Sequence, residues 1–324
     1  MNIKTKQTAD FARLKALLLS NVNVLALVLM IAAFYVMNPA FLNRFNLKNL
    51  LSNMAPLLVM ACGATYVRLI GSLDLSMGAV CSCANVLLVK LMPGLQGWAY
   101  IVALLFGAVT GFLLGIIQAR LKVPSFIASL GMMNVYDSVA LLISPSPQSV
   151  PKECRYLIEW GGVSLGVVSI LTIVALLVMI ALHAAQKSTP LGRNLNLIGS
   201  NQRAARLAGV HVARTQIFAF VVCGITSALA GILLAVKLKS SEPTMGDSFT
   251  LLAVAAVLLG GTPTTGGKGS VLMTLTGVMM VVVIQNGMTI VGVDAFWSQI
   301  VFGGIILLAM ALTSDRKSKN LIVK

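Results

Sequence analysis

The chain consists of long apolar runs separated by short polar connections. The runs cover residues 22–37, 50–70, 74–92, 98–118, 125–144, 163–183, 215–236, 249–260, 271–290 and 297–313. Most of them approach the roughly 20 residues that an α-helix needs to cross the hydrocarbon core of a bilayer. The run at 249–260 is shorter, so we expect there a tilted or broken helix, or one that continues back through Pro243–Ser248. The pattern predicts an all-α, polytopic membrane protein with about ten transmembrane helices.

Composition supports a membrane protein. Of the 324 residues, 58% are hydrophobic and only 10% are charged, whereas about 25% of the residues of a soluble domain are charged. The apolar run at 22–37 is not followed by a signal-peptide cleavage pattern, so we expect it to be retained as a span. We therefore predict an N-terminal tail over 1–21, a transmembrane domain over 22–313 and a C-terminal tail over 314–324.

Lys and Arg residues are distributed unevenly between the two sides of the predicted topology. If the N-terminus is cytoplasmic and all ten runs cross the bilayer, 17 of the 24 Lys and Arg residues lie on the cytoplasmic side. This agrees with the positive-inside rule. Both tails are basic, which favours an even number of spans with the N- and C-termini in the cytoplasm. Membrane topology thus explains the net charge of +15, and we expect no nucleic-acid partner.

The sequence offers no catalytic or metal-binding constellation. It has nine acidic residues, mostly near the ends of apolar runs or in connections, and its two histidines are His183 and His211. The HExxH motif is absent. The five cysteines are scattered, and Cys81-x-Cys83 does not have zinc-ligand spacing, so we expect the cysteines to be small core residues. We predict that the chain is not an enzyme and holds no metal.

The glycine-rich segment Gly261–Ser270 resembles a phosphate-binding loop only at first sight. In the pattern G-x-x-x-x-G-K-[ST], Thr262 stands at the first glycine and Gly269 stands at the Ser/Thr position. We interpret the segment as a turn between two spans that approach each other closely. The chain is therefore expected to bind no cofactor itself. If ATP and Mg²⁺ drive its function, a partner chain must bind them.

The longest predicted cytoplasmic connection, 184–214, contains a candidate helix at Ser200–Gly209. Ser200 or Asn201 can cap its start, and Gly209 suits a left-handed C-terminal stop. Basic residues surround its apolar positions. Two interpretations fit this pattern. The helix lies on lipid headgroups, or it docks into a cleft on a cytoplasmic partner.

The segment Gly71–Gly78 interrupts the helical pattern between the second and third apolar runs. Asp74 and Ser76 can cap the following helix and satisfy its free N–H groups. The segment is then a device that starts a helix, or an element of a substrate path or conformational change. The two interpretations are compatible.

Three segments together resemble the ribose-type permeases of ABC importers. Gly71–Gly78 resembles their GGIDLSVG element. Gly192-Arg-Asn with Ile198–Val210 resembles their cytoplasmic loop GR…IGGNxxAAxxSGI. Ala255–Thr262, with Gly266–Gly269 and Asn286–Val293, resembles their tail AAVVLGGTSLAGGxG…NNGLNLLGV. The order and spacing match, and the resemblance covers residues 40–313.

The resemblance implies a type II-like importer permease in the bacterial inner membrane, with ten spans in two pseudo-symmetric halves. It implies a cytoplasmic ABC ATPase that docks on the 184–214 loop, a periplasmic sugar-binding protein, and a second permease copy, identical or related, within the lipid bilayer. The implied coupling residues are Gly192, Arg193, Gly199, Asn201, Ala204, Ala205 and Gly209. The implied motif or gating residues are Asp74, Ser76, Gly78, Gly260, Gly261, Gly266 and Gly267.

The expected function is import of a monosaccharide, a pentose or hexose. The sequence has Phe249-Thr-Leu-Leu252 where the family has Y-E-L-D, and Gly-Ser-Leu-Asp where it has Gly-Gly-Ile-Asp. These departures bear on the substrate or on the contact with the binding protein. The alternatives are a nucleoside, a furanose or a pentose-derived signalling molecule as cargo, or a self-contained secondary transporter. Candidate path residues, each of which can equally form an interhelical hydrogen bond, are Asn85, Asn134, Asp137, Gln285 and Asn286.

Overall fold

The computed structural model describes residues 22–294, 296–297, 300–301 and 303–304. In this part of the chain, seven helices are long and apolar enough to cross a membrane. They are α3 (Arg44–Leu69), α4 (Met77–Leu95), α5 (Trp98–Ala119), α6 (Ser125–Ile143), α7 (Ile170–Ser188), α10 (Val212–Leu238) and α12 (Val271–Val291). Two shorter apolar helices, α2 (Val22–Met37) and α11 (Asp247–Leu259), correspond to two further predicted runs. The tails and most of the tenth run, 297–313, lie outside the described residues, so the count of ten spans stays a prediction.

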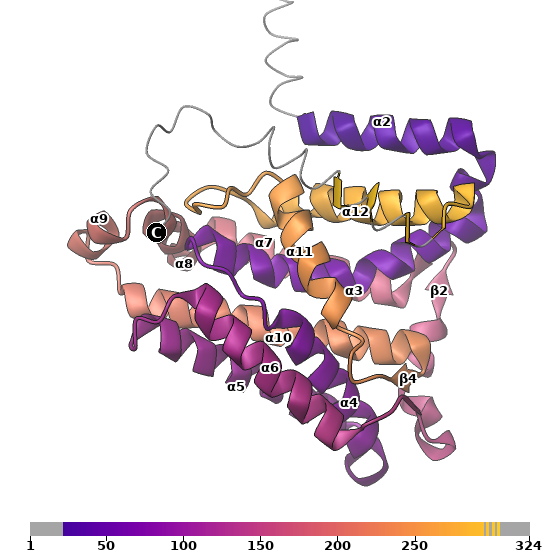
Figure 1. Cartoon of the computed structure of the whole chain (residues 1–324), viewed down its shortest axis with the longest axis horizontal. Coiled ribbons are helices and arrows are strands. Elements are labelled where there is room, and N and C mark those ends of the chain that lie inside the picture. The colour runs from indigo at the N-terminus through magenta and orange to yellow at the C-terminus, as the bar shows by residue number, and fades with distance from the viewer. Residues whose placement is uncertain (1–21, 295, 298–299, 302, 305–324) are drawn as a thin grey trace, which may run out of the picture.

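The remaining elements are short and lie at the two ends of the helical bundle. They are the 3₁₀ helices η1 (Pro39–Leu42), η2 (Lys152–Leu157) and η3 (Glu159–Gly162), the α-helices α8 (Pro190–Ser200) and α9 (Gln202–Leu207), and the strands β1 (Gln148–Ser149), β2 (Ser164–Leu165), β3 (Val168–Ser169) and β4 (Ser240–Ser241). Strand β1 pairs with β4 and β2 pairs with β3, both antiparallel. In Figure 1, α8 and α9 lie at one end of the bundle and the strands lie at the opposite end.

The start predicted for the run at 163–183 is wrong. Helix α7 begins only at Ile170, because the preceding residues form the β2–β3 hairpin. Gly166 turns this hairpin with a φ of +66°, a conformation that glycine adopts without steric cost. Ser169 then caps α7 by accepting a hydrogen bond from the backbone N–H of Thr172 at 3.2 Å.

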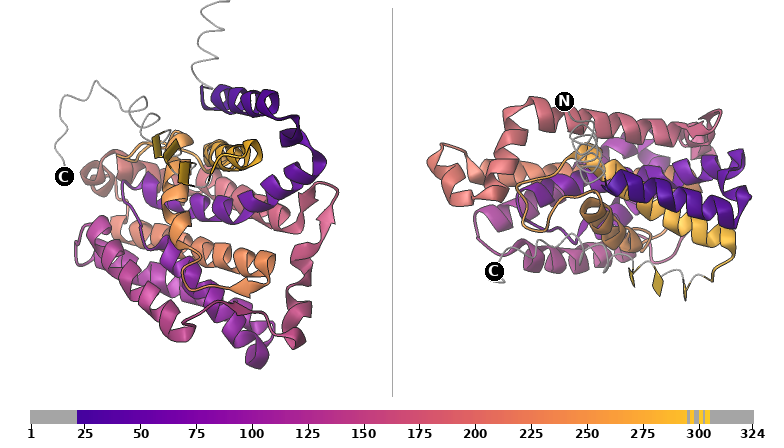
Figure 2. Two further views of the ribbon diagram at one scale, coloured as in Figure 1. Left: turned by 45° about the vertical axis from the view of Figure 1, so that its right-hand side comes forward. Right: turned by 90° about the horizontal axis from the view of Figure 1, so that it is seen from above.

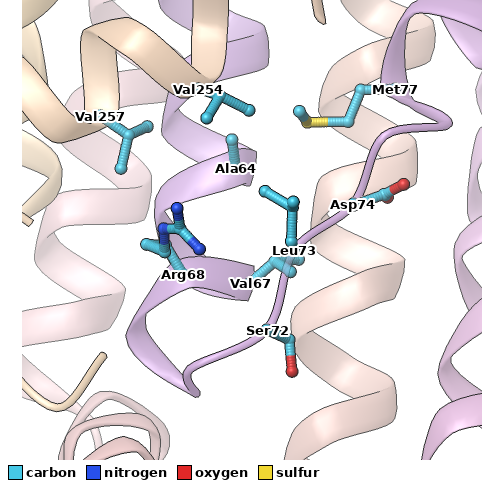
Figure 3. Close-up of a pocket in the computed structure, with 9 residues that line it drawn as sticks. All are labelled: Ala64, Val67, Arg68, Ser72, Leu73, Asp74, Met77, Val254 and Val257. Carbon is cyan, nitrogen blue, oxygen red and sulfur yellow. The ribbon is translucent and has the colours of Figure 1, made fainter. Parts of the chain in front are cut away.

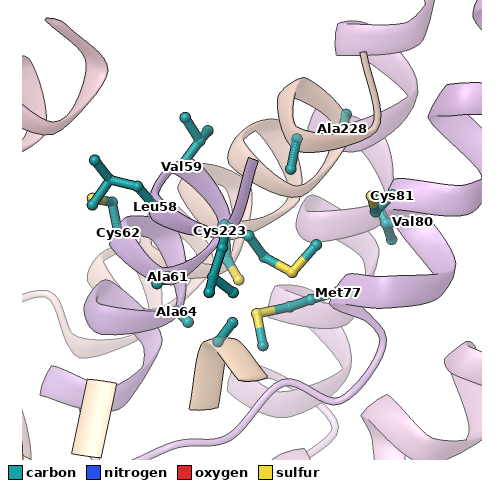
Figure 4. Close-up of a cluster of buried hydrophobic side chains, with 14 of the residues drawn as sticks. Leu58, Val59, Ala61, Cys62, Ala64, Met77, Val80, Cys81, Cys223 and Ala228 are labelled. Carbon is teal, nitrogen blue, oxygen red and sulfur yellow. The ribbon is translucent and has the colours of Figure 1, made fainter. Parts of the chain in front are cut away.

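Helices α3 and α10 form the centre of the bundle. They are the longest described helices, at 26 and 27 residues, and most of their residues are buried. Figure 4 shows part of the core between them and α4, where Leu58, Cys62, Met77 and Cys223 gather. All five cysteines are buried and unpaired, as expected of small core residues.

Small residues allow the central helices to approach closely. A Cβ atom on Gly224 of α10 would overlap the carbonyl oxygen of Gly107 on α5, and a Cβ on Gly107 would overlap that of Gly224. A Cβ on Gly63 of α3 would overlap the hydroxyl of Thr226 on α10. Apolar burial does not drive helices together in lipid, where close van der Waals packing at small residues is one of the contributions to their association.

Helix α2 lies away from the centre of the bundle, and helix α11 runs across the direction of the other helices. Helix α2 lies along α12 at the outer edge and has no buried residue, as Figure 2 shows and as expected of a helix whose surface faces lipid. Helix α11 runs across the direction of α10 and α12 in Figure 1. It contacts α12, α3 and α4. The short eighth run is therefore a tilted helix, and it does not continue back to Pro243, because α11 begins only at Asp247.

We predict that Gly224→Val lowers the stability of the protein by roughly 3 kcal/mol, near the upper end of the usual cost of overpacking. The added side chain must separate α10 from α5. The matched control is Gly131→Ala in α6, where nothing lies within 4 Å of an added Cβ. Thermal unfolding in detergent should show a lower midpoint for Gly224→Val and an unchanged or raised midpoint for Gly131→Ala. Equal midpoints for Gly224→Val and the wild type would contradict the packing described.

Candidate functional site

The three sequence segments that resemble the family meet at the α8/α9 end of the bundle. The end of α3, the end of α8 and the loop between α11 and α12 contact one another through their backbones. The N–H of Gly267 donates to the carbonyl oxygen of Leu69 at 2.9 Å. A Cβ on Gly199 would overlap both Leu69 and Gly267, and one on Gly266 would lie 2.5 Å from the backbone nitrogen of Gly71. We call Leu69–Gly71, Gly199–Ser200 and Gly266–Gly267 the junction.

The glycines of the junction are needed for conformation as well as for space. Gly71, Gly266 and Gly267 have φ values of +75°, +78° and +78°, which side-chain-bearing residues rarely adopt. The predicted motif residues Gly266 and Gly267 thus hold two loops against each other. The other two predicted glycines of this loop end α11. Gly260 packs against Met273, whose carbonyl oxygen would lie 2.7 Å from an added Cβ, and Gly261 follows with a φ of +89°.

Gln186, which belongs to none of the motifs in the sequence, fixes the end of α7 to the start of α12. Its Nε2 donates to the carbonyl oxygen of Gly269 at 3.0 Å, and its Oε1 accepts from the N–H of Val271 at 2.9 Å. A Cβ on Gly192 would overlap the backbone of Gln186, so α8 turns tightly away from α7. A glutamine in the last turn of an apolar helix is the only signal of this role in the sequence.

The predicted helix at Ser200–Gly209 is confirmed, with a shorter span. Helix α9 covers Gln202–Leu207, and Ser200 belongs to the preceding α8. Asn201 is the cap, because its Oδ1 accepts from the N–H groups of Arg203 and Ala204, both at 3.0 Å.

Gly209 ends α9 in the way that the sequence predicts. It has a φ of +81°, and the N–H of Val210 donates to the carbonyl oxygen of Ala205 at 3.0 Å. The N–H of Gly209 donates to the carbonyl oxygen of Arg206 at 3.1 Å. These two bonds make a Schellman motif, which satisfies the free carbonyls at the helix end.

The predicted coupling residues divide into a buried set and an exposed set. Gly192 is buried with Leu195 and Ile198 of α8, and Ala205 is buried on the inner side of α9. Ala204 and Arg193 are exposed. The outer side of α9 presents Leu207, which is 90% exposed, with Ala204 and Ala208 beside it and Arg203 and Arg206 at its edges. We call these five residues the α9 surface.

Asp74 and Ser76 organise the segment between α3 and α4. The buried Asp74 accepts at Oδ1 from the backbone N–H and the hydroxyl of Ser76, at 2.8 and 2.7 Å. The prediction that the Ser76 side chain caps α4 is wrong, because that hydroxyl is turned back to Asp74. The side chain that caps α4 is instead Thr250 of α11, whose Oγ1 accepts a hydrogen bond from the N–H of Gly78 at 2.9 Å. The predicted motif residue Gly78 leaves room for this contact.

A small cavity of about 10 Å³ lies where this segment passes α3 and α11. Figure 3 shows Arg68 and Asp74 on opposite sides of it, with Val254 and Val257 from α11 above them. The volume is about enough for one water molecule. It is too small for a sugar-sized solute.

The candidate path residues have different environments. Asn85 is completely buried and links α4 to Gly231 and Glu242, with hydrogen bonds of 3.1 and 2.9 Å. Asn286 and Asn46 exchange hydrogen bonds of 2.8 and 2.9 Å. These two path candidates, Asn85 and Asn286, therefore crosslink helices.

The other three path candidates are not crosslinks. Asn134 and Gln285 lie at least partly exposed in the single chain, and Asn134 donates to its own helix at Leu130. Asp137 lines a second, larger cavity between α4, α6 and α11. Within the described ranges, His, Cys, Asp and Glu residues form no group of three or more that could hold a metal ion.

Comparison with known proteins agrees with the arrangement of these segments. The family model described as branched-chain amino acid transport system / permease component matches residues 46–310. The ribose import permease of Escherichia coli (strain K12) is 34% identical over an alignment of 325 positions that covers 97% of this chain and 100% of that protein. The ribose import permease of Bacillus subtilis is 34% identical over 299 residues, covering 90% and 91% of the two chains.

A third relative is named for a different sugar. The galactose/methyl galactoside import permease of Salmonella typhimurium is 30% identical over 314 residues, covering 91% of this chain and 94% of that one. No solved structure matches.

We predict that Asn201→Ala destabilises α9 by about 1 kcal/mol, the usual cost of losing an N-cap side chain. Amide hydrogen exchange over residues 202–208 should then become roughly fivefold faster, since about 1.4 kcal/mol corresponds to a factor of ten. Asn201→Asp keeps the acceptor oxygen and should exchange like the wild type. If Asn201→Ala leaves the exchange rates of this segment unchanged, the cap does not hold α9.

Proposed function

Because this chain belongs to the branched-chain amino acid transport system / permease component family, we propose that it forms the membrane path of an ABC importer for a monosaccharide. The relatives named above are permeases for ribose and for galactose or methyl galactoside. A permease component is a transport subunit, so the energy of ATP hydrolysis enters through a separate ATPase chain. A periplasmic sugar-binding protein delivers the solute, and a second permease copy completes the path in the inner membrane.

The α9 surface is the proposed docking site for the ATPase, and its exposed Leu207 carries this proposal. The apolar side of α8, with Leu195 and Ile198, is already buried against the protein. What stays exposed is a six-residue helix with one large apolar side chain between two arginines. The binding of a helix to lipid headgroups scales with the apolar area that it buries, and α9 exposes only one large apolar side chain. A short helix with one exposed leucine between two arginines is better suited to a cleft on a partner protein than to a lipid surface.

The junction gives the proposed docking site a mechanical connection to the spans. Gly199 and Ser200 at the end of α8 contact Gly267, which is hydrogen-bonded to Leu69 at the end of α3. The closest of these contacts are between backbones, so they leave no flexible side chain to absorb a displacement. A movement that closure of the ATPase subunits imposes on α9 therefore reaches α3, and also the loop between α11 and α12.

Orientation follows from the same proposal. An ATPase in the cytoplasm requires the α8/α9 end to face the cytoplasm, which is the side that the distribution of Lys and Arg favours. The strands at the opposite end then face the periplasm, where the binding protein docks.

A cargo other than ribose or galactose is a second candidate, and one observation favours it. Thr250 and Leu252 stand where the family pattern has acidic residues, and Thr250 lines the larger cavity. A changed set of hydrogen-bonding groups at that position suits a related solute, such as a nucleoside or a pentose-derived signalling molecule.

We predict that Leu207→Glu abolishes ATP-driven uptake because a charge replaces the apolar centre of the docking surface. The purified permease is reconstituted in proteoliposomes with its ATPase and binding protein, and uptake of labelled sugar is measured beside ATP hydrolysis. Uptake should fall at least tenfold, as expected when one central contact worth roughly 1.4 kcal/mol or more is lost. The control is Leu207→Met, which keeps a large apolar side chain at the same exposed position and should take up sugar like the wild type. Normal uptake by Leu207→Glu would refute docking at α9.

Labelling with a membrane-impermeant maleimide tests the orientation. All five native cysteines are buried, so they give a low background. A cysteine at the exposed Gln202 should react only in inside-out vesicles, and a cysteine at the exposed Ser149 should react only in right-side-out vesicles. The reverse pattern would overturn the proposed topology.

A further inference from the structure

The larger cavity has the dimensions of a small-solute site. Its volume is about 360 Å³, within the range of roughly 300–1,000 Å³ that small-molecule sites occupy. It lies between the start of α4, the middle of α6 and the start of α11, and its lining comprises Leu75, Ala79, Leu130, Met133, Asp137, Asp247, Thr250 and Leu251. Asp137 lies in the apolar helix α6 and is partly buried, whereas Asp247 is exposed at the start of α11. An acidic side chain within a membrane span is costly and generally marks a substrate path.

Asp137 has an acceptor atom that the described protein leaves without a donor. Its Oδ1 is buried and has no hydrogen-bond partner. Asp247 adds a second carboxyl group to the same lining, and the lining contains no basic residue among the described residues. A buried polar atom without a partner is unfavourable, so a donor supplied by a solute in the cavity would stabilise this arrangement.

Thr250 indicates that the solute is not simply a cation. Its Oγ1 accepts from the N–H of Gly78, and the hydroxyl hydrogen has no acceptor among the described residues. It is therefore free to donate to an oxygen of the solute, which a metal ion or an ammonium group does not offer. Two acceptors and one donor together match a hydroxyl-bearing molecule, because each hydroxyl both donates and accepts.

We propose that this cavity is a binding station for a neutral polyhydroxylated solute. Asp137 and Asp247 accept hydrogens from its hydroxyls, and Thr250 donates to one of its oxygens. Leu75, Leu130 and Met133 cover the C–H surfaces of the solute. This inference rests on the proposed function, because it places the monosaccharide at defined residues.

The cavity is also connected to the junction. Leu75 belongs to the segment between α3 and α4, which begins at the junction residue Gly71 and is stiffened by Asp74 and Ser76. Thr250 is hydrogen-bonded to the first turn of α4. A displacement of the junction therefore moves two walls of the cavity, so the station can bind solute in one state of the transporter and release it in another.

The test measures protection of a cysteine introduced into the cavity. Met133→Cys in the full-length permease is reconstituted in proteoliposomes and reacted with N-ethylmaleimide, alone or with D-ribose, D-galactose or xylitol. At least one of these compounds should slow the modification of the introduced thiol severalfold. A cysteine introduced at the exposed Lys187, in the last turn of α7, is the control and should react at the same rate in all solutions.

Substitution of the carboxyl groups then identifies the contacts. In Met133→Cys, adding Asp137→Leu or Asp247→Leu should abolish protection. Asp137→Asn should retain part of it, because an amide oxygen still accepts a hydroxyl hydrogen. Absence of protection by all three compounds, protection by ethylammonium instead, or protection that survives both leucine substitutions would overturn the inference. If the leucine variants do not fold, the asparagine variant and the protection measurements with Met133→Cys alone still decide.

The proposed function and this inference fail separately. If the sugars protect the thiol of Met133→Cys but the reconstituted complex shows no ATP-driven uptake, the proposed function is wrong and the station stands. If the complex takes up sugar but this thiol is not protected, the station is wrong and the proposed function stands.

Discussion

The backbone contact between Leu69 and Gly267, with Gly199 pressed against both, is the constraint on which the rest of the structure depends. Peptide groups within a membrane protein need internal hydrogen-bond partners, and here the loop between α11 and α12 donates to the free carbonyl oxygen of Leu69 at the end of α3. The three segments are far apart in the sequence, and glycines provide the space at the point of contact. A side chain at Gly199 would separate them. Because the contact is between backbones, we propose that the exposed α9 and the buried start of α4 move together.

The same principle operates deeper in the bundle. Gly107 and Gly224 bring α5 and α10 into backbone contact, and Asn85 supplies hydrogen bonds to two segments that meet α4. The lining of the larger cavity is different, because Asp137 keeps an acceptor without a partner in the described protein. This unpartnered oxygen, which lies beside a cavity of solute size, is the basis for the proposed binding of a solute there.

Much of the fold follows from local sequence patterns. The apolar run at 98–118 predicts α5 almost to the residue, and Gly209 predicts the end of α9, since these features depend on neighbours in the chain. The sequence offers Ser200 or Asn201 as the cap of α9, and the structure shows that Asn201 is the cap. Gln186 and Thr250 could not be predicted in this way. Their partners lie 85 and 172 residues away, and a hydrogen bond of that kind leaves no periodic signal. Asn85 and Asp137 are both single polar residues within apolar runs of the sequence. Only the packing around them shows that Asn85 crosslinks helices and that Asp137 lines a cavity.

The central claim is that motion of α9 reaches the membrane path through the junction. The most direct measurement is the number of sugar molecules imported per ATP hydrolysed by the reconstituted complex carrying Gly199→Ala, with Gly162→Ala as a control at a position with open space. The added methyl group of Gly199→Ala separates α8 from Leu69 and Gly267 without changing the α9 surface. We expect ATP hydrolysis to continue while import per ATP falls severalfold, and the control to behave like the wild type. An unchanged ratio in Gly199→Ala would contradict transmission through the junction.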